Sequence, residues 1–117
     1  MIVPASIIEL ASEVATSGDC LRGQVGAVIY DFHSGEPLST GYNRQHTPCK
    51  SCMARLVKST GCTNSLHAEI VALNKLPSLL PARIGVYTTL SPCINCAEGV
   101  SGALEGHIVN WSYGAIY

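Results

Sequence analysis

Residues 84–113, IGVYTTLSPCINCAEGVSGALEGHIVNWSY, decide the expected fold. The opening IGVYTTL alternates in polarity and is rich in β-branched residues, which predicts a strand. Ser91 can cap a helix and Pro92 suits its first position, so we expect a helix that runs to about Ala103. Residues 107–113 return to a strand pattern. A strand–helix–strand unit of this kind is expected to be a right-handed crossover between parallel strands.

The rest of the chain extends this unit into an α/β fold. The patterns predict a helix over 5–17, a strand over 25–30, a turn over 31–37, a return strand over 38–42 and a helix over 66–76. Residues 43–65 follow neither period, apart from a weak helical pattern over 53–58, and such a long aperiodic segment is normally functional or cross-linked. The order of elements predicts one domain over 1–117, with helices on the faces of a sheet.

Composition limits the classes of function. Of 117 residues, 47% are hydrophobic and 13% charged, which suits a compact core and a buried oligomer face. The net charge of −1 gives no basic field to gather long nucleic acid, although a free nucleotide needs none. The first residues do not resemble a signal peptide, and no apolar run approaches the ~20 residues of a membrane span. We therefore expect a soluble, cytoplasmic protein that forms a homo-oligomer.

The number and spacing of the cysteines indicate metal binding. There are six, an unusual number for so short a chain. They lie at positions 20, 49, 52, 62, 93 and 96, and two pairs have the Cys-x-x-Cys spacing. In a reducing compartment this spacing favours metal binding over disulfides, although a single pair could also be a redox pair.

His67, Glu69, Cys93 and Cys96 form the candidate catalytic site. Cys93 and Cys96 share one face of a helical first turn, where the helix dipole stabilises the thiolates that zinc binds. With the His67 imidazole they give three ligands, which leaves the fourth tetrahedral position for water, as in catalytic zinc sites. Glu69, two residues after His67, need not bind metal and can exchange protons with that water. Taken alone, a histidine is more often a packed polar group, so the combination carries the hypothesis.

His67-Ala68-Glu69 followed by Pro92-Cys93-x-x-Cys96 is the pattern of zinc-dependent deaminases. The chain resembles the cytidine deaminase superfamily, and most of all its deoxycytidylate (dCMP) deaminase branch. The similar stretches are CLRGQVGAVI from Cys20, STGYN over 39–43 and VYTTLSPC over 86–93. The resemblance covers about residues 6–113 and implies a three-layer αβα fold with a central mixed sheet, and hydrolysis of dCMP to dUMP and ammonia.

The resemblance also assigns residues to the substrate and to a second metal. Asn43 should bind the sugar hydroxyl, and the backbone near Ala68 and Ser91 should read the edge of the base. The phosphate would meet cations, for which the candidates are Arg22, Arg44 and Lys50. Some members of the branch carry a structural zinc, which here would be held by the thiolates of Cys20, Cys49, Cys52 and Cys62. His46 could replace one thiolate, and some of these cysteines could instead be buried apolar residues.

Three departures from the dCMP deaminase branch keep other substrates open. Arg44-Gln45-His46 replaces a glycine-rich continuation, Asn64 stands where an arginine is frequent, and Val71 stands where asparagine is usual. His67 to Leu73 is instead similar to the tRNA adenosine deaminase branch, although the acidic balance disfavours a tRNA substrate. The alternatives are therefore cytidine, deoxycytidine, a modified cytosine nucleotide or tRNA adenosine. A non-catalytic zinc module used for assembly is the alternative from another class, but it would have no use for Glu69.

Overall fold

The computed structural model describes residues 3–17, 24–45, 65–90 and 94–115. The weak helical pattern over 53–58 lies outside these ranges. In chain order the elements are α1 (Ala5–Ala15), β1 (Gly26–Asp31), β2 (Pro37–Tyr42), β3 (Arg44–Gln45), β4 (Ser65–Leu66), α3 (Ala68–Asn74), β5 (Arg83–Leu90), α4 (Ile94–Ala103) and β6 (Ile108–Ala115).

The main sheet has four strands in the order β2-β1-β5-β6. β1 is antiparallel to both β2 and β5, whereas β5 and β6 are parallel. The expected hairpin and the parallel strand–helix–strand unit are both confirmed. The sheet is therefore mixed, as the resemblance implied.

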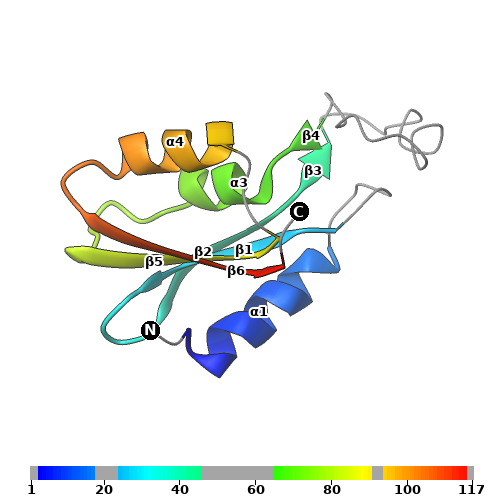
Figure 1. The fold of residues 1–117 in the computed structure, drawn as a ribbon, viewed down its shortest axis with the longest axis horizontal. Coiled ribbons are helices and arrows are strands. Elements are labelled where there is room, and N and C mark those ends of the chain that lie inside the picture. Colours follow the sequence, from blue (N-terminus) through cyan, green and yellow to red (C-terminus); the bar gives the residue numbers. More distant parts are fainter. Residues whose placement is uncertain (1–2, 18–23, 46–64, 91–93, 116–117) are drawn as a thin grey trace.

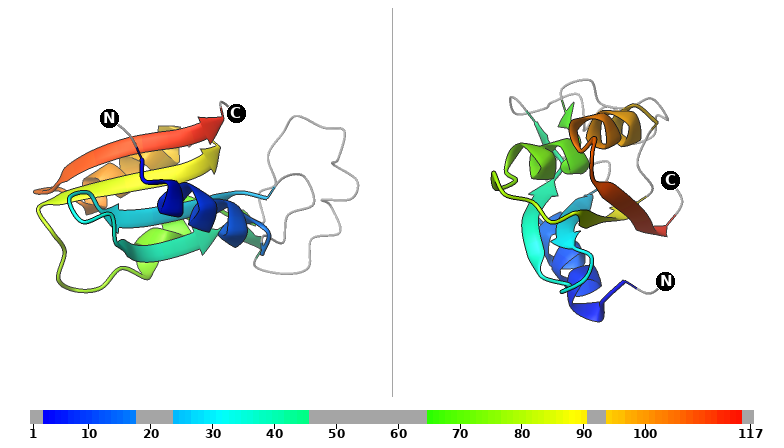
Figure 2. Two further views of the ribbon diagram at one scale, coloured as in Figure 1. Left: turned by 90° about the horizontal axis from the view of Figure 1, so that it is seen from below. Right: turned by 90° about the vertical axis from the view of Figure 1, so that its left-hand side faces the viewer.

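Helices cover both faces of this sheet (Figures 1 and 2). α1 packs on one face, where Ile7 and Ala11 join a core cluster with Val28, Tyr30 and Tyr87. α3 and α4 lie on the opposite face, and their buried side chains share a second cluster with those of β1 and β5. The three-layer αβα architecture is thus confirmed. No helix in the described ranges is long and apolar enough to cross a membrane.

The connection between β1 and β2 is a tight turn around Asp31. The Asp31 carboxylate accepts hydrogen bonds from the N–H groups of His33 and Ser34, at 2.9 and 3.3 Å. Gly35 donates to the Asp31 carbonyl at 2.8 Å and has a φ of 76°, which a side chain would disfavour. The expected turn with Gly35 at its tight point is confirmed.

A second, two-stranded sheet was not predicted. Arg44 pairs with Leu66 and Gln45 with Ser65 in an antiparallel ladder. Because Ser65 and Leu66 are in a strand, α3 begins at Ala68 rather than at 66 as expected. The ladder joins the two ends of the intervening segment 46–64 at one end of the main sheet (Figure 1).

Candidate active site

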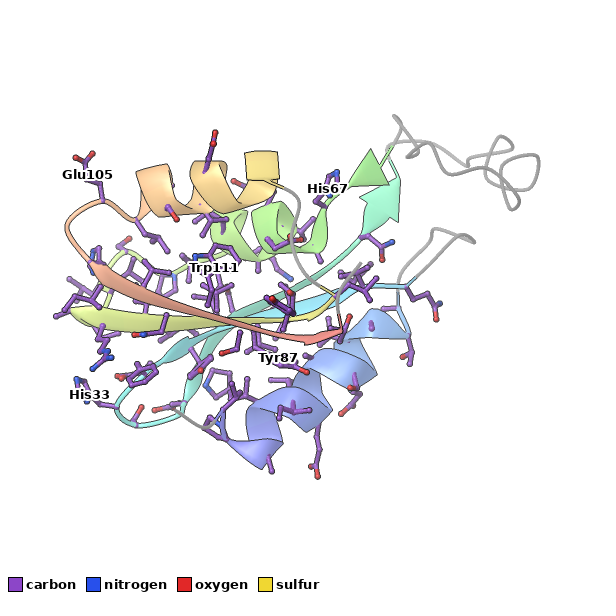
Figure 3. The ribbon with its side chains drawn as sticks, viewed as in Figure 1. His33, His67, Tyr87, Glu105 and Trp111 are labelled. Atoms are coloured by element: carbon purple, nitrogen blue, oxygen red, sulfur yellow. The ribbon has the colours of Figure 1, made fainter. Side chains whose placement is uncertain are left out.

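The site is built on the junction between β4 and α3. His67 is the N-cap of α3 with an extended backbone (φ −74°, ψ 146°), and its carbonyl accepts the N–H of Val71 at 3.1 Å. The chain therefore changes from strand to helix at His67. Its imidazole is exposed, and Figure 3 shows it at the end of α3 that adjoins β4.

Two residues of β2 bring α3 close to the sheet. A Cβ at Gly41 would lie 2.4 Å from the Ala68 carbonyl oxygen and 2.5 Å from the Ala72 nitrogen, so only glycine fits beneath the helix. One turn further along α3, the Ser39 hydroxyl donates to the Ala72 carbonyl at 2.7 Å. Together these contacts fix the height and position of the helix that carries Glu69.

Glu69 lies in the first turn of α3 and is only 4% exposed. Burial raises the pKa of its carboxyl above the ordinary value, and a hydrogen bond from its own backbone N–H and the nearby His67 act in the opposite direction. Glutamate is almost never fully buried without a partner or a role. A buried carboxyl with a perturbed pKa at the end of a sheet is a candidate for acid–base chemistry.

α4 lies beside α3 on the same face of the sheet. The two helices are close enough that a Cβ at Gly99 would lie 3.8 Å from the Ile70 Cδ1. Both helices begin at the same end of the sheet (Figure 1). The first turn of α4, whose backbone includes Cys96, is therefore at the same end as His67 and Glu69. An imidazole nitrogen and helix-terminal thiols are ligands that zinc prefers, so these residue types suit the metal.

Asn43 lies at the same end of the sheet, between β2 and β3. Its N–H donates to the Val25 carbonyl at 3.2 Å, and its Oδ1 accepts the Val25 N–H at 2.9 Å. This reciprocal pair directs the side-chain oxygen toward Val25, the residue before β1, and so sets the orientation of the amide. Arg44 pairs with Leu66, so their chain neighbours Asn43 and His67 flank the same ladder.

The structure thus describes some of the predicted site residues. Buried Ala68 and Glu69, together with exposed His67, lie at one helix start, and Asn43 lies at the neighbouring strand end. For Arg44 and Cys96 the backbone alone is described. The remaining candidates lie outside the described residues, namely Cys20, Arg22, His46, Cys49, Lys50, Cys52, Cys62, Ser91 and Cys93.

Sequence reasoning missed three supporting residues. Gly41 and Ser39 position α3, and Thr89 accepts the Gly26 N–H on its hydroxyl oxygen at 3.1 Å, which links the ends of β5 and β1. All three lie in the stretches that carry the family resemblance, which was the available signal. Their roles depend on contacts between distant parts of the chain, so spacing along the sequence could not assign them.

The αβα fold, His67 at a helix N-cap and the buried Glu69 in the first turn are the arrangement that the pattern of zinc-dependent deaminases predicts. The family described as the cytidine and deoxycytidylate deaminase zinc-binding region matches residues 3–109, and the chain belongs to this family. A comparison with curated protein sequences found no significant match.

Solved structures agree with this assignment. The dCMP deaminase of cyanophage S-TIM5 in complex with dCMP and dUMP is 25% identical, with a TM-score of 0.75 over 97% of this chain and 81% of that one. The apo form of the cyanophage enzyme is 20% identical, with a TM-score of 0.64 over 92% of this chain and 95% of that one. Guanine deaminase from Bacillus subtilis is 18% identical, with a TM-score of 0.55 over 98% of this chain and 66% of that one. The last two share the fold.

Proposed function

We propose that this protein is a zinc-dependent hydrolase that deaminates a cytosine deoxynucleotide, converting dCMP to dUMP and ammonia. The observation that carries the proposal is the buried carboxyl of Glu69, in the first turn of the helix that His67 caps. Similarity to a dCMP deaminase crystallised with dCMP and dUMP supports the choice of substrate.

His67, Cys93 and Cys96 would hold the catalytic zinc. The donors are one imidazole and two thiols from the starts of neighbouring helices, and three protein ligands leave a position open. When bound, zinc supplies a Lewis acid that makes water nucleophilic at neutral pH by lowering its pKa toward ~7.

Glu69 would move the protons. Its carboxylate takes a proton from the attacking water and gives it to N3 of the cytosine ring as the water oxygen adds to C4. A second transfer through the same carboxylate protonates the amino group, which leaves as ammonia while the C4 carbonyl forms. Because Glu69 is buried, its carboxyl is kept away from bulk water, so the protons that it moves stay within the site.

Substrate recognition would come from the neighbouring elements. Asn43, which the resemblance places at the sugar hydroxyl, would bind it through its side-chain amide, which donates through its nitrogen and accepts through its oxygen. The backbone near Ala68 and Ser91 would read the edge of the base. Arg22, Arg44 or Lys50 would pair with the 5′-phosphate, and an arginine would do so through two parallel hydrogen bonds.

A structural zinc at Cys20, Cys49, Cys52 and Cys62 is part of the proposal. Four thiolates close the coordination sphere, which is typical of structural sites. Three of these cysteines belong to the segment between β3 and β4, where the sequence has no period of its own. A metal would supply the cross-link that such a segment needs.

The first experiment is a screen of ammonia release with the zinc-loaded protein. The substrates are dCMP, deoxycytidine, CMP, adenosine and guanine, and we expect dCMP to have the highest kcat/KM. If deoxycytidine matched dCMP, the phosphate would not be recognised and the nucleotide assignment would fail, while the deaminase assignment would stand. If no substrate released ammonia, the enzymatic proposal itself would fail in favour of a zinc-binding assembly module.

The second experiment tests the role of Glu69. Glu69→Gln should retain zinc and the fold but lose about 10²–10⁴-fold in kcat, the usual contribution of a general acid–base group. Glu105→Gln is the matched control, because Glu105 is exposed and lies far from His67 (Figure 3). Full activity in Glu69→Gln would refute the mechanism.

A further inference from the structure

β6 is an open edge of the main sheet. It is the last strand in the order β2-β1-β5-β6 and spans Ile108–Ala115. Figure 2 shows it along the border of the sheet, and within the described ranges no strand pairs with its outer side. A strand of this length leaves a row of backbone groups available for pairing with another strand.

Within its own sequence, β6 has none of the residues that usually protect an edge strand against pairing. Proteins commonly place charged residues, proline or a bulge on such strands. The sequence IVNWSYGA contains no charge and no proline, and its register with β5 runs without a shift from Ile108 to Tyr113. Ile108 and Tyr113 are 60% and 49% exposed, which is high for large apolar side chains in a sheet.

One backbone hydrogen bond determines which groups point outward. The Ile108 N–H donates inward, to the Ala82 carbonyl at 2.8 Å. In a parallel ladder, alternate residues of a strand turn their N–H and C=O toward the same neighbour. Ile108, Asn110 and Ser112 therefore face β5. The N–H and C=O groups of Val109, Trp111 and Tyr113 face away from it.

Val109 and Tyr113, whose backbone groups face outward, lie at equal distances in sequence from Trp111. The side chains on either side of Trp111 also match in polarity. Reversing the strand about this residue places apolar Val109 opposite apolar Tyr113 and polar Asn110 opposite polar Ser112. Residues on opposite strands of an antiparallel pair have side chains on the same face and exchange hydrogen bonds in pairs. The strand is thus its own complement in one register, in both backbone direction and side-chain type.

We propose that two copies of this chain pair through β6, antiparallel and about a two-fold axis at Trp111, into one continuous sheet. The backbone of Val109 in one copy would exchange hydrogen bonds with that of Tyr113 in the other, and the two copies of Trp111 would exchange hydrogen bonds with each other. A two-fold axis closes the assembly at a dimer, because each copy uses its β6 edge. The other edge strand of the main sheet, β2, begins with Pro37 and has a register shift against β1, both of which disfavour such pairing. The uncharged strand and the net charge of −1 put little electrostatic repulsion between the copies.

The test compares two substitutions at Tyr113. Tyr113→Pro removes an outward N–H in each copy without removing a hydrogen bond to β5, and proline is tolerated on edge strands. Tyr113→Val changes the side chain but keeps the N–H and suits a strand. Sedimentation equilibrium should give the wild-type protein twice the mass of a 12.3 kDa chain. The dimer of Tyr113→Pro should be about tenfold weaker or more, because two hydrogen bonds are lost per dimer, and that of Tyr113→Val should be affected much less.

Other outcomes would overturn the proposal. A wild-type protein that stays monomeric over a roughly hundredfold range of concentration does not pair through β6. An oligomer that neither variant weakens, or that both weaken equally, is not held by this backbone. Amide hydrogen exchange of the wild-type protein gives a second measurement if Tyr113→Pro fails to fold. The amides of Val109, Trp111 and Tyr113 should become protected as the concentration rises, and free exchange at all concentrations would refute the pairing.

Discussion

Gly41→Ala tests whether the close contact between α3 and β2 sets the geometry of the site. The added Cβ would lie 2.4 Å from the Ala68 carbonyl oxygen and 2.5 Å from the Ala72 nitrogen, whereas ordinary contacts begin at 3.4 Å. Both obstructing atoms are backbone, so no side chain can move aside. The helix must therefore rise from the sheet by about 1 Å, and His67 and Glu69 must move with it.

A displacement of this size has two expected consequences. Overpacking of a close-packed interior costs about 1–3 kcal/mol of the free energy of unfolding. A misplacement of about 1 Å in a catalytic group can cost on the order of 10²-fold in rate. We expect kcat for the best substrate to fall to this extent, with a smaller change in KM. The assays are steady-state ammonia release and urea unfolding, with kcat expressed per folded molecule.

Two other glycines provide the controls. Gly26→Ala would place a Cβ 2.0 Å from the Ala11 carbonyl oxygen and displace α1, which carries none of the proposed site residues, so stability should fall while kcat per folded molecule is retained. Gly102→Ala meets nothing within 4 Å, and alanine in a helix should add about 0.5–1 kcal/mol to stability. If Gly41→Ala behaved like Gly26→Ala, with normal kcat in the folded fraction, the positioning of the site by Gly41 would be refuted.

Four further outcomes are expected. Ser39→Ala removes the 2.7 Å hydrogen bond to the Ala72 carbonyl and should cost about 0.5–1.5 kcal/mol in urea unfolding, so unchanged stability would contradict its role. Thr89→Val leaves the Gly26 N–H without the hydroxyl acceptor and should cost about 1–3 kcal/mol, measured in the same way. Cys49→Ser should lower both the zinc content and the melting temperature, because a structural zinc contributes directly to folding, and an unchanged zinc content would count against the second site. Treatment with a chelator should stop ammonia release and added zinc should restore it, whereas activity of the metal-free protein would exclude the proposed chemistry.

Much of the fold could be predicted because its main elements are periodic. The hairpin over 25–42 and the unit over 84–113 each carry their own turn or cap signals, and both are confirmed. The boundaries were less accurate. The first helix ends at Ala15 rather than Ser17, and the last strand extends two residues beyond Tyr113. The β3–β4 ladder was missed because a pair of two-residue strands has no period and forms only when Arg44 and Leu66 are brought together in space.

For the site, too, local features could be predicted from the sequence and contacts between distant residues could not. His67 and Glu69 could be predicted as site residues because their chemistry and spacing are local, and their roles stay predictions. The burial of Glu69 could not, because it depends on how closely α3 approaches the sheet. That approach is set by Gly41 and Ser39, which are distant in sequence, and by the sheet order that places β2 beside β1. The roles of the cysteines stay predictions.

The β3–β4 ladder has a consequence for how this enzyme can diversify. Gln45 and Ser65, which flank the stretch between the two strands, are opposite each other, so the two ends of that stretch are attached to the fold at one point. Its length is therefore independent of the register of the main sheet, and the entropy of closing it grows by only about 0.6 kcal/mol for each doubling. Changes of length in this stretch can therefore leave the relation between Asn43 and His67 across the ladder intact, as long as the proposed zinc ligands Cys49, Cys52 and Cys62 are kept. Insertions and deletions at this point are thus expected to leave the strand order and register of the main sheet unchanged.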